Sequence, residues 1–570
     1  MLARMAPHGT ALGLALALAL AACGDDDAPD IDAGTDAGEP DAGVRAPDVC
    51  DELALSRAPM RTTGTGDGFG EVAGDFTVQT LSGPWTLSEH WSGCESYVFL
   101  VHFPTAGGDE LFATGLDRLF NEGPRNTRYF FLSHAADPAA RRALVESLAR
   151  TLEEGLAFWE IPEADRDFRR ERIHFVTDRV DEVEGSVGAH VRSYLAWAQT
   201  PEATVDLGER GRAGAPAPAV FGIDRAQTWD PGGNLSPAVG RAPELGMAAF
   251  LGHYYEYRGR LDARLAAEEE SGEASVVSLL DERTTLRVFT REVTLPDAAA
   301  MAGFDRLEVD VEITCEAQNP FACSEWDRIA GVHLCASDDC SERLELARWI
   351  TPYWRRGRQR WAIDATPLLA LLRDGGTRSF FVELGPEWER ATEWVASVSL
   401  RFRATGEDER AIGGERAFTG GTFDSSYNTR EPFRFTPPAG AARVELVTIL
   451  SGHGQTDGDN CAEWCDHRHA FSVNGTALPV IAHEGARIGG PLGCASRASE
   501  GVLPGQWGNW AQARAYWCPG LPVEARRTDI TAQVRLGEEN ELTYAGAFRD
   551  GAPNGGDIAL SAYVVWYDAR

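Results

Sequence analysis

The sequence predicts a mainly β protein in which two antiparallel β-sandwiches follow an α/β domain. Between residues 70 and 265, short apolar strands alternate with helical patterns, as in an α/β sheet. From residue 266 to residue 570, stretches of alternating apolar and polar residues are separated by Gly and Pro, with few helix signals. A stretch of about 300 residues leaves room for two sandwiches, and jelly rolls are antiparallel sandwiches of this length.

The N-terminus has the features of an export signal. Arg4 precedes an Ala/Leu run, residues 11–22, which is too short to cross a bilayer but has the length of a signal-peptide core. Leu20-Ala21-Ala22-Cys23 resembles a bacterial lipobox, which would make residues 1–22 a lipoprotein signal peptide and Cys23 the lipidated first residue. An ordinary signal peptide cleaved nearby is the alternative.

Residues 23–60 are expected to form an acidic, disordered tether. The segment after Cys23 is rich in Asp, Ala and Gly, and such a composition buries too little apolar surface to offset its ordering entropy. We therefore expect an exported bacterial lipoprotein, in the periplasm or on the outer membrane or cell surface, whose lipid anchor is its only membrane contact. We also expect a monomer.

Charge excludes several kinds of function. The formal net charge is −34. The chain has no lysine, so its 53 Lys and Arg residues are all arginine. Chemistry that depends on lysine, such as a Schiff base or a P-loop, is therefore excluded. Nucleic acid is not an expected partner for so acidic a chain.

The cysteines indicate disulfides rather than metal or redox chemistry. Of 11 cysteines, ten remain when Cys23 is set aside, an even number in an oxidising compartment. Spacing alone does not determine connectivity. Proximity in the sequence favours Cys315–Cys323, Cys335–Cys340, Cys461–Cys465 and Cys494–Cys518, which leaves Cys50 and Cys94 as the least certain pair.

Residues 61–265 are the predicted α/β domain. Its expected strands are residues 75–81, 96–103, 173–178 and 219–224. Residues 139–159 carry an apolar stripe typical of an amphipathic helix. The order of elements resembles a thioredoxin-like, peroxiredoxin-type domain, but residues 104–110, where that family has its redox cysteine, contain none. We expect a structural or docking domain that is dispensable for activity; a redox lipoprotein is the alternative.

Residues 275–405 and 415–570 are the two predicted sandwiches. Alternating or apolar stretches mark their strands at residues 306–313, 394–402, 442–450, 540–548 and 558–567. Their cysteine-flanked loops combine Trp, Arg and acidic residues, as in Trp326-Asp327-Arg328 and in the CAEWC segment, residues 461–465. Tryptophan can stack on a sugar ring and carboxylates can bind its hydroxyls or transfer protons, so the loops indicate a carbohydrate site.

The CAEWC segment has three possible interpretations. A small disulfide ring would display Glu463 and Trp464 to a substrate. A zinc site with His467 and His469 is an alternative, although zinc usually takes four ligands from paired clusters. A redox pair usually has two residues between its cysteines, whereas three lie here. The ring is the favoured interpretation, and we expect no metal and no cofactor.

Six motifs together resemble the peptide-N-glycosidase F family. They are CSEWDR (323–328), RWITPYW (348–354), SGxG (451–454), CAEWC (461–465), LGC (492–494) and WxxxRAxWCPG (510–520). They occur in the family's order over about residues 275–570. The resemblance implies two eight-stranded jelly rolls packed side by side and hydrolysis of the amide bond between asparagine and an N-glycan. The substrates would be N-glycosylated proteins or glycopeptides.

The resemblance also implies site residues. Asp327 corresponds to the aspartate that activates water, and Glu463 to the acid that binds the first N-acetylglucosamine. Glu383 is our choice for a third acid, with Glu387 as the alternative. The implied substrate-binding residues are Trp326, Arg328, His453, Trp464, Arg514 and Trp517.

One departure from the family concerns the sugar pocket. The family has SGWGH where this chain has Ser451-Gly452-His453-Gly454-Gln455, which puts glycan preference in doubt. Two other interpretations stay open: a glycosidase, which would also use two carboxylates, and a non-catalytic glycan-binding surface lipoprotein.

Overall fold

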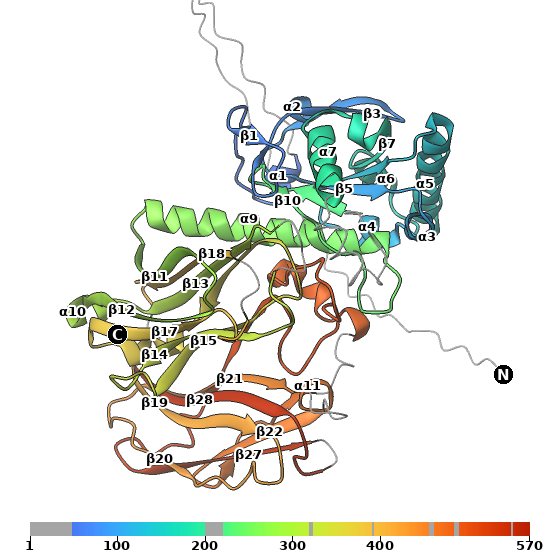
Figure 1. Ribbon diagram of the computed structural model, residues 1–570. Helices are drawn as coiled ribbons and strands as arrows, with labels where there is room; N and C mark the ends of the chain where they lie inside the picture. Colours follow the sequence, from blue (N-terminus) through green and yellow to red (C-terminus); the bar gives the residue numbers. More distant parts are fainter. Residues whose placement is uncertain are drawn as a thin grey trace, which may run out of the picture. The chain divides into compact units, whose positions relative to one another are not determined.

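The computed structural model describes residues 48–199, 220–317, 323–389, 393–407, 409–454, 461–483, 490–548 and 551–569 (Figure 1). The predicted signal peptide, Cys23 and most of the tether lie outside the described residues. Residues 48–570 form one compact unit. In the described part of the chain, no helix combines the length and apolarity needed to span a membrane.

The N-terminal sheet is mixed, as expected for an α/β domain. Strands β5 (Ser96–His102), β6 (Thr127–Ser133) and β7 (Ile173–Arg179) run parallel at its centre. The sheet order is β10-β9-β5-β6-β7-β3-β4, where the outer strands are β10 (Trp229–Asp230), β9 (Val220–Ile223), β3 (Phe76–Thr80) and β4 (Gly83–Thr86), and β8 (Glu184–Gly185) pairs with β3.

The predicted amphipathic helix is confirmed as α5 (Pro138–Phe158). The Asp137 carboxylate caps its first turn by accepting a hydrogen bond from the amide of Ala139, and Pro138 occupies the first turn, where its missing N–H costs nothing. Val145, Leu148, Leu152 and Leu156 are buried on the face toward the core.

The predicted tether ends too late in the sequence. Residues 48–60, assigned above to disordered chain, begin with helix α1 (Val49–Glu52). The Asp48 carboxylate accepts from the amides of Cys50 and Asp51, and Cys50 forms a disulfide with Cys94. The cap orders the helix and the disulfide ties it to Cys94, which composition could not reveal.

The first sandwich consists of a four-stranded and a five-stranded antiparallel sheet. The four-stranded order is β11 (Ala274–Thr284), β18 (Trp394–Arg403), β13 (Arg306–Cys315), β16 (Gly357–Asp364). The five-stranded order is β12 (Val288–Asp297), β17 (Gly375–Glu383), β14 (Ile329–Cys335), β15 (Arg343–Ile350), β25 (Leu521–Val523). The alternation predicted for residues 306–313 is confirmed, since its four apolar side chains are buried.

The second sandwich also consists of a four-stranded and a five-stranded antiparallel sheet. Its four-stranded order is β19 (Glu409–Thr422), β28 (Asp557–Ala569), β21 (Arg443–His453), β26 (Ala525–Asp529). Its other sheet has the order β20 (Phe433–Phe435), β27 (Asn540–Phe548), β22 (His467–Val473), β23 (Thr476–Ala477), and β24 (Ile481–His483) pairs with β22. The chain thus contains more strand than helix, as predicted.

Strand β25 joins the two sandwiches. It lies within the region predicted as the second sandwich, yet it pairs with β15 of the first, with Ile350 opposite Leu521. One residue later, β26 pairs with β21 of the second sandwich. The segment 521–529 is therefore held by both sandwiches.

Four of the five predicted disulfides are confirmed: Cys50–Cys94, Cys315–Cys323, Cys335–Cys340 and Cys494–Cys518. Cys465 is also disulfide-bonded. The side chain of Cys461, its predicted partner, lies outside the described residues.

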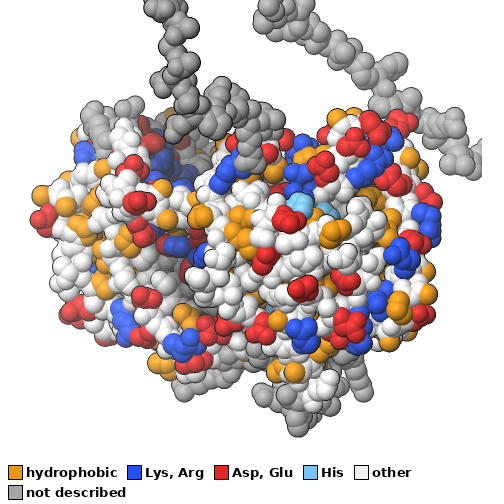
Figure 2. All heavy atoms as spheres, turned by 90° about the horizontal axis from the view of Figure 1, so that it is seen from above, with side chains coloured by type: hydrophobic (Ala, Val, Ile, Leu, Met, Phe, Trp, Pro, Cys, Tyr) orange, Lys and Arg blue, Asp and Glu red, His pale blue; other side chains and the backbone are white. Residues whose placement is uncertain are grey.

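The α/β domain shares a hydrophobic core with the second half of the chain. Residues of the N-terminal sheet, such as Leu100 and Val220, belong to one buried cluster with Tyr353, Trp510 and Leu521. Helix α9 (Ala248–Glu270) adds polar contacts to the first sandwich: the Tyr254 hydroxyl donates to the Arg358 carbonyl (3.1 Å), and Arg264 pairs with Glu308 (3.0 Å). In the face shown in Figure 2, acidic side chains are interspersed with arginines rather than gathered in one patch.

This shared core predicts that the N-terminal domain is needed for a stable fold, contrary to the expectation from the sequence that it is dispensable for activity. Deleting residues 48–265 should expose the apolar side of Trp510 and Leu521, and we expect insoluble chain or loss of the cooperative thermal transition, measured by circular dichroism. Deleting only residues 24–47, which precede the compact unit, is the control and should leave Tm unchanged. A larger deletion that still melts cooperatively near the full-length Tm would show that the sandwiches fold alone.

Candidate active site

Asp327 lies in a loop that is clamped on both sides. Disulfide Cys315–Cys323 fixes the start of the loop, and β14 begins two residues after Asp327. The hydroxyl of Thr351 accepts from the amide of Arg328 (2.8 Å) and donates to the carbonyl of Trp326 (3.1 Å). Trp326 has a φ of +80°, which is unfavourable for a bulky residue and marks strain of the kind found at functional sites.

Glu463 lies in a single helical turn, α11 (Cys461–Trp464), and is 7% exposed. Its carbonyl accepts a hydrogen bond from the amide of Ala515 (3.0 Å). The CAEWC segment is therefore attached to the segment that carries Arg514, and the Glu463 side chain points to the same guanidinium.

Arg514 brings the acids of the two sandwiches together. Its Nε donates to Glu463 Oε1 (2.9 Å) and lies 3.6 Å from Asp327 Oδ2. Its Nη2 donates to the Tyr353 hydroxyl (3.0 Å), which itself donates to Asp327 Oδ2 (2.6 Å). Its Nη1 donates to the carbonyls of Asn509 and Gln512. Asp327, Tyr353, Glu463 and Arg514 are hereafter called the acid cluster.

The N-terminal domain supports the loop that carries Arg514. The indole of Trp510 donates to the Ser236 carbonyl (3.0 Å), and the amide of Val239 donates to Asn509 Oδ1 (3.2 Å). Since Asn509 also accepts from Arg514, the α/β domain is two contacts away from the acid cluster.

Burial changes the protonation of both acids. Burial and the nearby Asp327 charge raise the pKa of Glu463 to about 7, against the opposing effect of Arg514. Burial also raises the pKa of Asp327, while Arg514 and the Tyr353 hydroxyl lower it. Burial disfavours charge on Arg514, yet the surrounding Tyr353, Asp327 and Glu463 raise its pKa, so it stays cationic.

Exposed aromatic side chains lie next to Asp327. Trp326 is 44% exposed and Trp388 is 67% exposed. The Arg328 guanidinium lies 4.6 Å from the centre of the Trp388 ring and its Nε lies 3.7 Å from Glu389. Glu389 is buried and accepts from the amide of Glu325 (2.5 Å). Large exposed apolar rings beside buried acids are a surface suited to sugar rings.

Three other predicted binding residues are close to the cluster, but two of them are largely hidden. The Arg514 guanidinium lies 4.6 Å from the Trp464 ring and 4.9 Å from that of Trp517. Trp517 is 2% exposed and its indole donates to the Gly452 carbonyl (2.8 Å). His453 stacks on Trp517 at 4.9 Å, and burial lowers its pKa to about 3. Trp517 and His453 thus form the wall behind Arg514.

The structure places Glu383 in different surroundings from the other acids. Burial raises its pKa to about 7, and the charged groups that act on it are Arg343, Glu345 and Arg348. Arg348 pairs with Glu345 (2.7 Å) and donates to Ser451 of the second sandwich (2.7 Å). The alternative, Glu387, is exposed.

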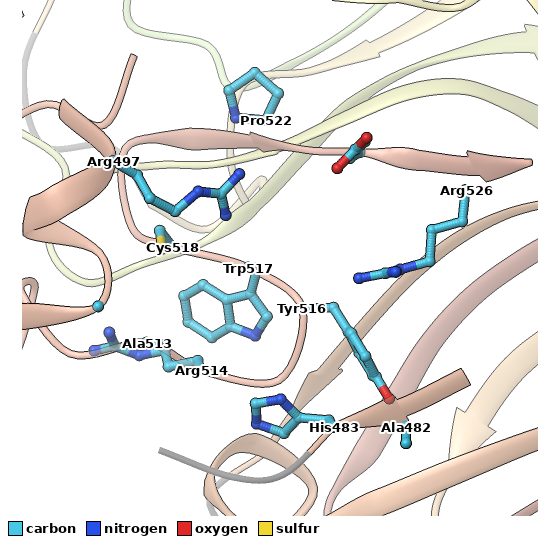
Figure 3. Close-up of a pocket in the computed structure, with 12 residues that line it drawn as sticks. Ala482, His483, Arg497, Ala513, Arg514, Tyr516, Trp517, Cys518, Pro522 and Arg526 are labelled. Atoms are coloured by element: carbon cyan, nitrogen blue, oxygen red, sulfur yellow. The ribbon is translucent and has the colours of Figure 1, made fainter. Parts of the chain in front are cut away.

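A cavity of about 230 Å³ lies beside the acid cluster (Figure 3). Its lining includes Arg497, Trp517 and Arg526, together with Tyr516 and His483. Both sandwiches contribute, because Pro522 lies in β25 and Arg526 in β26. In the parts of the chain that the structure describes, no group of three or more His, Cys, Asp or Glu side chains could hold a metal ion.

Part of this chain is similar in sequence to known proteins. Residues 423–565 match the family model "Peptide-N-glycosidase F, C terminal". The chain is 26% identical over 264 residues to peptide-N(4)-(N-acetyl-β-D-glucosaminyl)asparagine amidase F of Elizabethkingia miricola, covering 43% of this chain and 69% of the relative. This chain is similar in sequence to peptide-N-glycosidase F. Glu463, Arg514 and Trp517 all fall within the part that matches the peptide-N-glycosidase F model.

Two solved structures match part of this chain. A crystal structure of peptide-N(4)-(N-acetyl-β-D-glucosaminyl)asparagine amidase is 22% identical and covers 52% of this chain and 96% of its own, with a TM-score of 0.41. A structure of PNGF-II is 11% identical and covers 54% of this chain and 67% of its own, also with a TM-score of 0.41.

Sequence reasoning missed several residues of the site. Tyr353 and Thr351 lie in the RWITPYW motif, but nothing in their spacing showed that they contact Asp327 and its neighbours. Trp388 and Glu389 follow the strand that carries Glu383, and their proximity to Arg328 arises only when the loop folds back. The signal available in the sequence was the density of aromatic and acidic residues after that strand.

Glu463 should make stability depend on pH. Its folded pKa of about 7 exceeds the ordinary value of 4.5, so its contribution is fully present below pH 4.5 and is lost as pH rises through 7. Between pH 5 and pH 8, the wild-type chain should lose up to about 3 kcal/mol more unfolding free energy than Glu463→Gln, measured in urea. The exposed Glu387→Gln is the matched control and should follow the wild type. Equal pH dependence of Glu463→Gln and wild type would contradict a raised pKa.

Proposed function

We propose that this chain is an N-glycan amidase that hydrolyses the amide bond between asparagine and the first N-acetylglucosamine of glycoproteins or glycopeptides. The main support is the acid cluster, in which the buried Glu463 and the partly buried Asp327, from different sandwiches, share one arginine. The similarity to peptide-N-glycosidase F supports the proposed substrate class. In this proposal the two pairs of sheets are jelly rolls, and the N-terminal domain is a thioredoxin-like scaffold.

The proposed reaction uses a water molecule and no covalent intermediate. The Tyr353 hydroxyl and Arg514 both contact Oδ2 of Asp327, and in this proposal the Asp327 carboxylate takes a proton from water. The hydroxide attacks the amide carbon, the C–N bond breaks, and the proton passes to the leaving nitrogen. The products are aspartate in place of asparagine and a glycosylamine. Carboxylates serve as general bases of this kind.

The other residues bind and orient the substrate. Burial raises the pKa of Glu463, which favours its protonated form, so it can donate to or accept from a hydroxyl of the first sugar. Trp326 and Trp388 offer exposed rings for the sugar faces. We propose export as a lipoprotein with Cys23 lipidated, which would place the site where extracellular glycoproteins are available, and action as a monomer. A glycan-binding lipoprotein without catalysis is the alternative.

Mass analysis of both products tests the proposal. Incubation with a defined N-glycopeptide should yield a peptide in which asparagine has become aspartate, together with the complete glycan. A glycosidase would instead leave a sugar on asparagine, and a binding protein would retain the glycopeptide without any product.

Asp327→Asn tests the base. It preserves the side-chain shape but removes the proton acceptor, and kcat should fall about 10²–10⁴-fold with little change in Tm. Glu383→Gln, whose surroundings are separate from the acid cluster, should cost much less in kcat. If Asp327→Asn keeps a kcat near that of the wild type, Asp327 is not the base.

A further inference from the structure

His467 and His469, which the metal alternative had singled out, form a chain of hydrogen bonds that ends beside Glu463. His467 Nε2 lies 3.0 Å from the Ala462 carbonyl, and His467 Nδ1 lies 2.8 Å from His469 Nε2. His469 Nδ1 lies 2.7 Å from the Tyr544 hydroxyl, which is 2.7 Å from that of Tyr427. Both histidines are fully buried.

The chemistry of these groups gives the chain one direction. A carbonyl only accepts, so His467 Nε2 carries the proton, and in a neutral ring Nδ1 must accept. His469 Nε2 therefore donates to it, and His469 Nδ1 accepts from the Tyr544 hydroxyl, which leaves Tyr427 to donate to Tyr544. A proton added to His467 Nδ1 would face the His469 N–H, so this arrangement requires both rings to be neutral.

The end of this chain determines how Glu463 is held. The Ala462 carbonyl belongs to the peptide plane on the N-terminal side of Glu463. The plane on the other side is held by the amide of Ala515, which donates to the Glu463 carbonyl (3.0 Å). Gly452 leaves room for this arrangement, because a Cβ there would lie 1.9 Å from the Ala462 carbonyl oxygen and 2.8 Å from His467 Nε2.

We infer that His467 and His469 are positioning residues that orient Glu463 toward Arg514 and the first sugar. They touch neither substrate nor reacting atoms. Their hydrogen bonds set each other's tautomers and hold the Ala462 carbonyl, and with it the peptide plane from which Glu463 extends. The inference rests on the proposed function only for its kinetic consequence.

Other polar groups surround the two rings. Asp466 acts on His467 and raises its pKa, whereas burial, the largest effect, and His483 lower it, to about 4. Burial and both other histidines keep the pKa of His469 well below its usual value. Tyr516 packs edge-on against His467 at 5.5 Å, and Arg526 lies over the Tyr516 ring at 5.0 Å. The neutral forms needed by the hydrogen-bond chain are therefore the ones expected at neutral pH.

The first experiment reads the tautomers without any need for turnover. Long-range ¹H–¹⁵N spectra of histidine-labelled full-length protein, assigned with His467→Gln and His469→Gln, should show both rings protonated on Nε2 alone at pH 7. In Tyr544→Phe, which removes the donor to His469 Nδ1, the His469 signals should shift toward a tautomer mixture. Nδ1 protonation of either ring in the wild type would overturn the inference.

The second experiment separates positioning from stability. His469→Leu should raise KM for a glycopeptide about fivefold, as expected for one lost hydrogen bond, and should move the Glu463 titration followed by carboxyl ¹³C shifts. His469→Gln, which keeps a donor for His467, should restore most of both values. The matched control is His190→Leu, since His190 is a buried histidine that donates to the Asp67 carbonyl in the N-terminal domain. It should lower Tm and leave KM and the Glu463 titration unchanged.

The outcomes keep the two proposals distinct. If His469→Leu lowers Tm like His190→Leu but changes neither KM nor the Glu463 titration, the histidines are structural only. If the wild type shows no amidase activity, the proposed function fails, while the tautomers and the Glu463 titration still decide the positioning role.

Discussion

The arrangement of this site depends on one buried cation, Arg514. It is 2% exposed and contacts Asp327 from the first sandwich and Glu463 from the second. Two carboxyls buried this closely would repel each other if both were charged and unpaired. A permanently charged guanidinium with its donors in a fixed fork can satisfy both, together with Tyr353 and two backbone carbonyls, which lysine could not do.

The position of Arg514 is itself set by three parts of the chain. On the C-terminal side of Arg514, disulfide Cys494–Cys518 and strand β25 fix the chain. Strand β25 belongs to the same sheet as β14, which directly follows the Asp327 loop. On the N-terminal side of Arg514, Trp510 is bonded to Ser236 of the α/β domain. Buried charges cost several kcal/mol in desolvation when their partners move, so a site of this kind needs support from every side.

Much of this fold was predictable from local patterns. Period-two alternation marked β13 and β18, an apolar stripe and a Pro-capped start marked α5, and sequence proximity predicted three short-range disulfides. The pairing of β25 with the first sandwich was not predictable. Its three residues carry no periodicity, and its partner strand β15 is far away in the sequence. The shared core under the α/β domain was missed for the same reason: its contacts join segments hundreds of residues apart.

The site shows the same division between local and long-range information. Asp327, Glu463 and Arg514 were predicted because each stands in an unusual motif, and the structure brings the three together. Tyr353 and the two histidines were not predicted as supports, since hydrogen-bond partners depend on side-chain direction.

Positive φ at Trp326 and Tyr516, on either side of the cluster, costs about 1–3 kcal/mol each and persists only where surrounding bonds over-determine the backbone. Thr351 supplies such bonds around Asp327, and Ala515 and His467 do so around Glu463. The rigidity of the two acids is thus a property of the backbone that presents them as much as of the arginine between them.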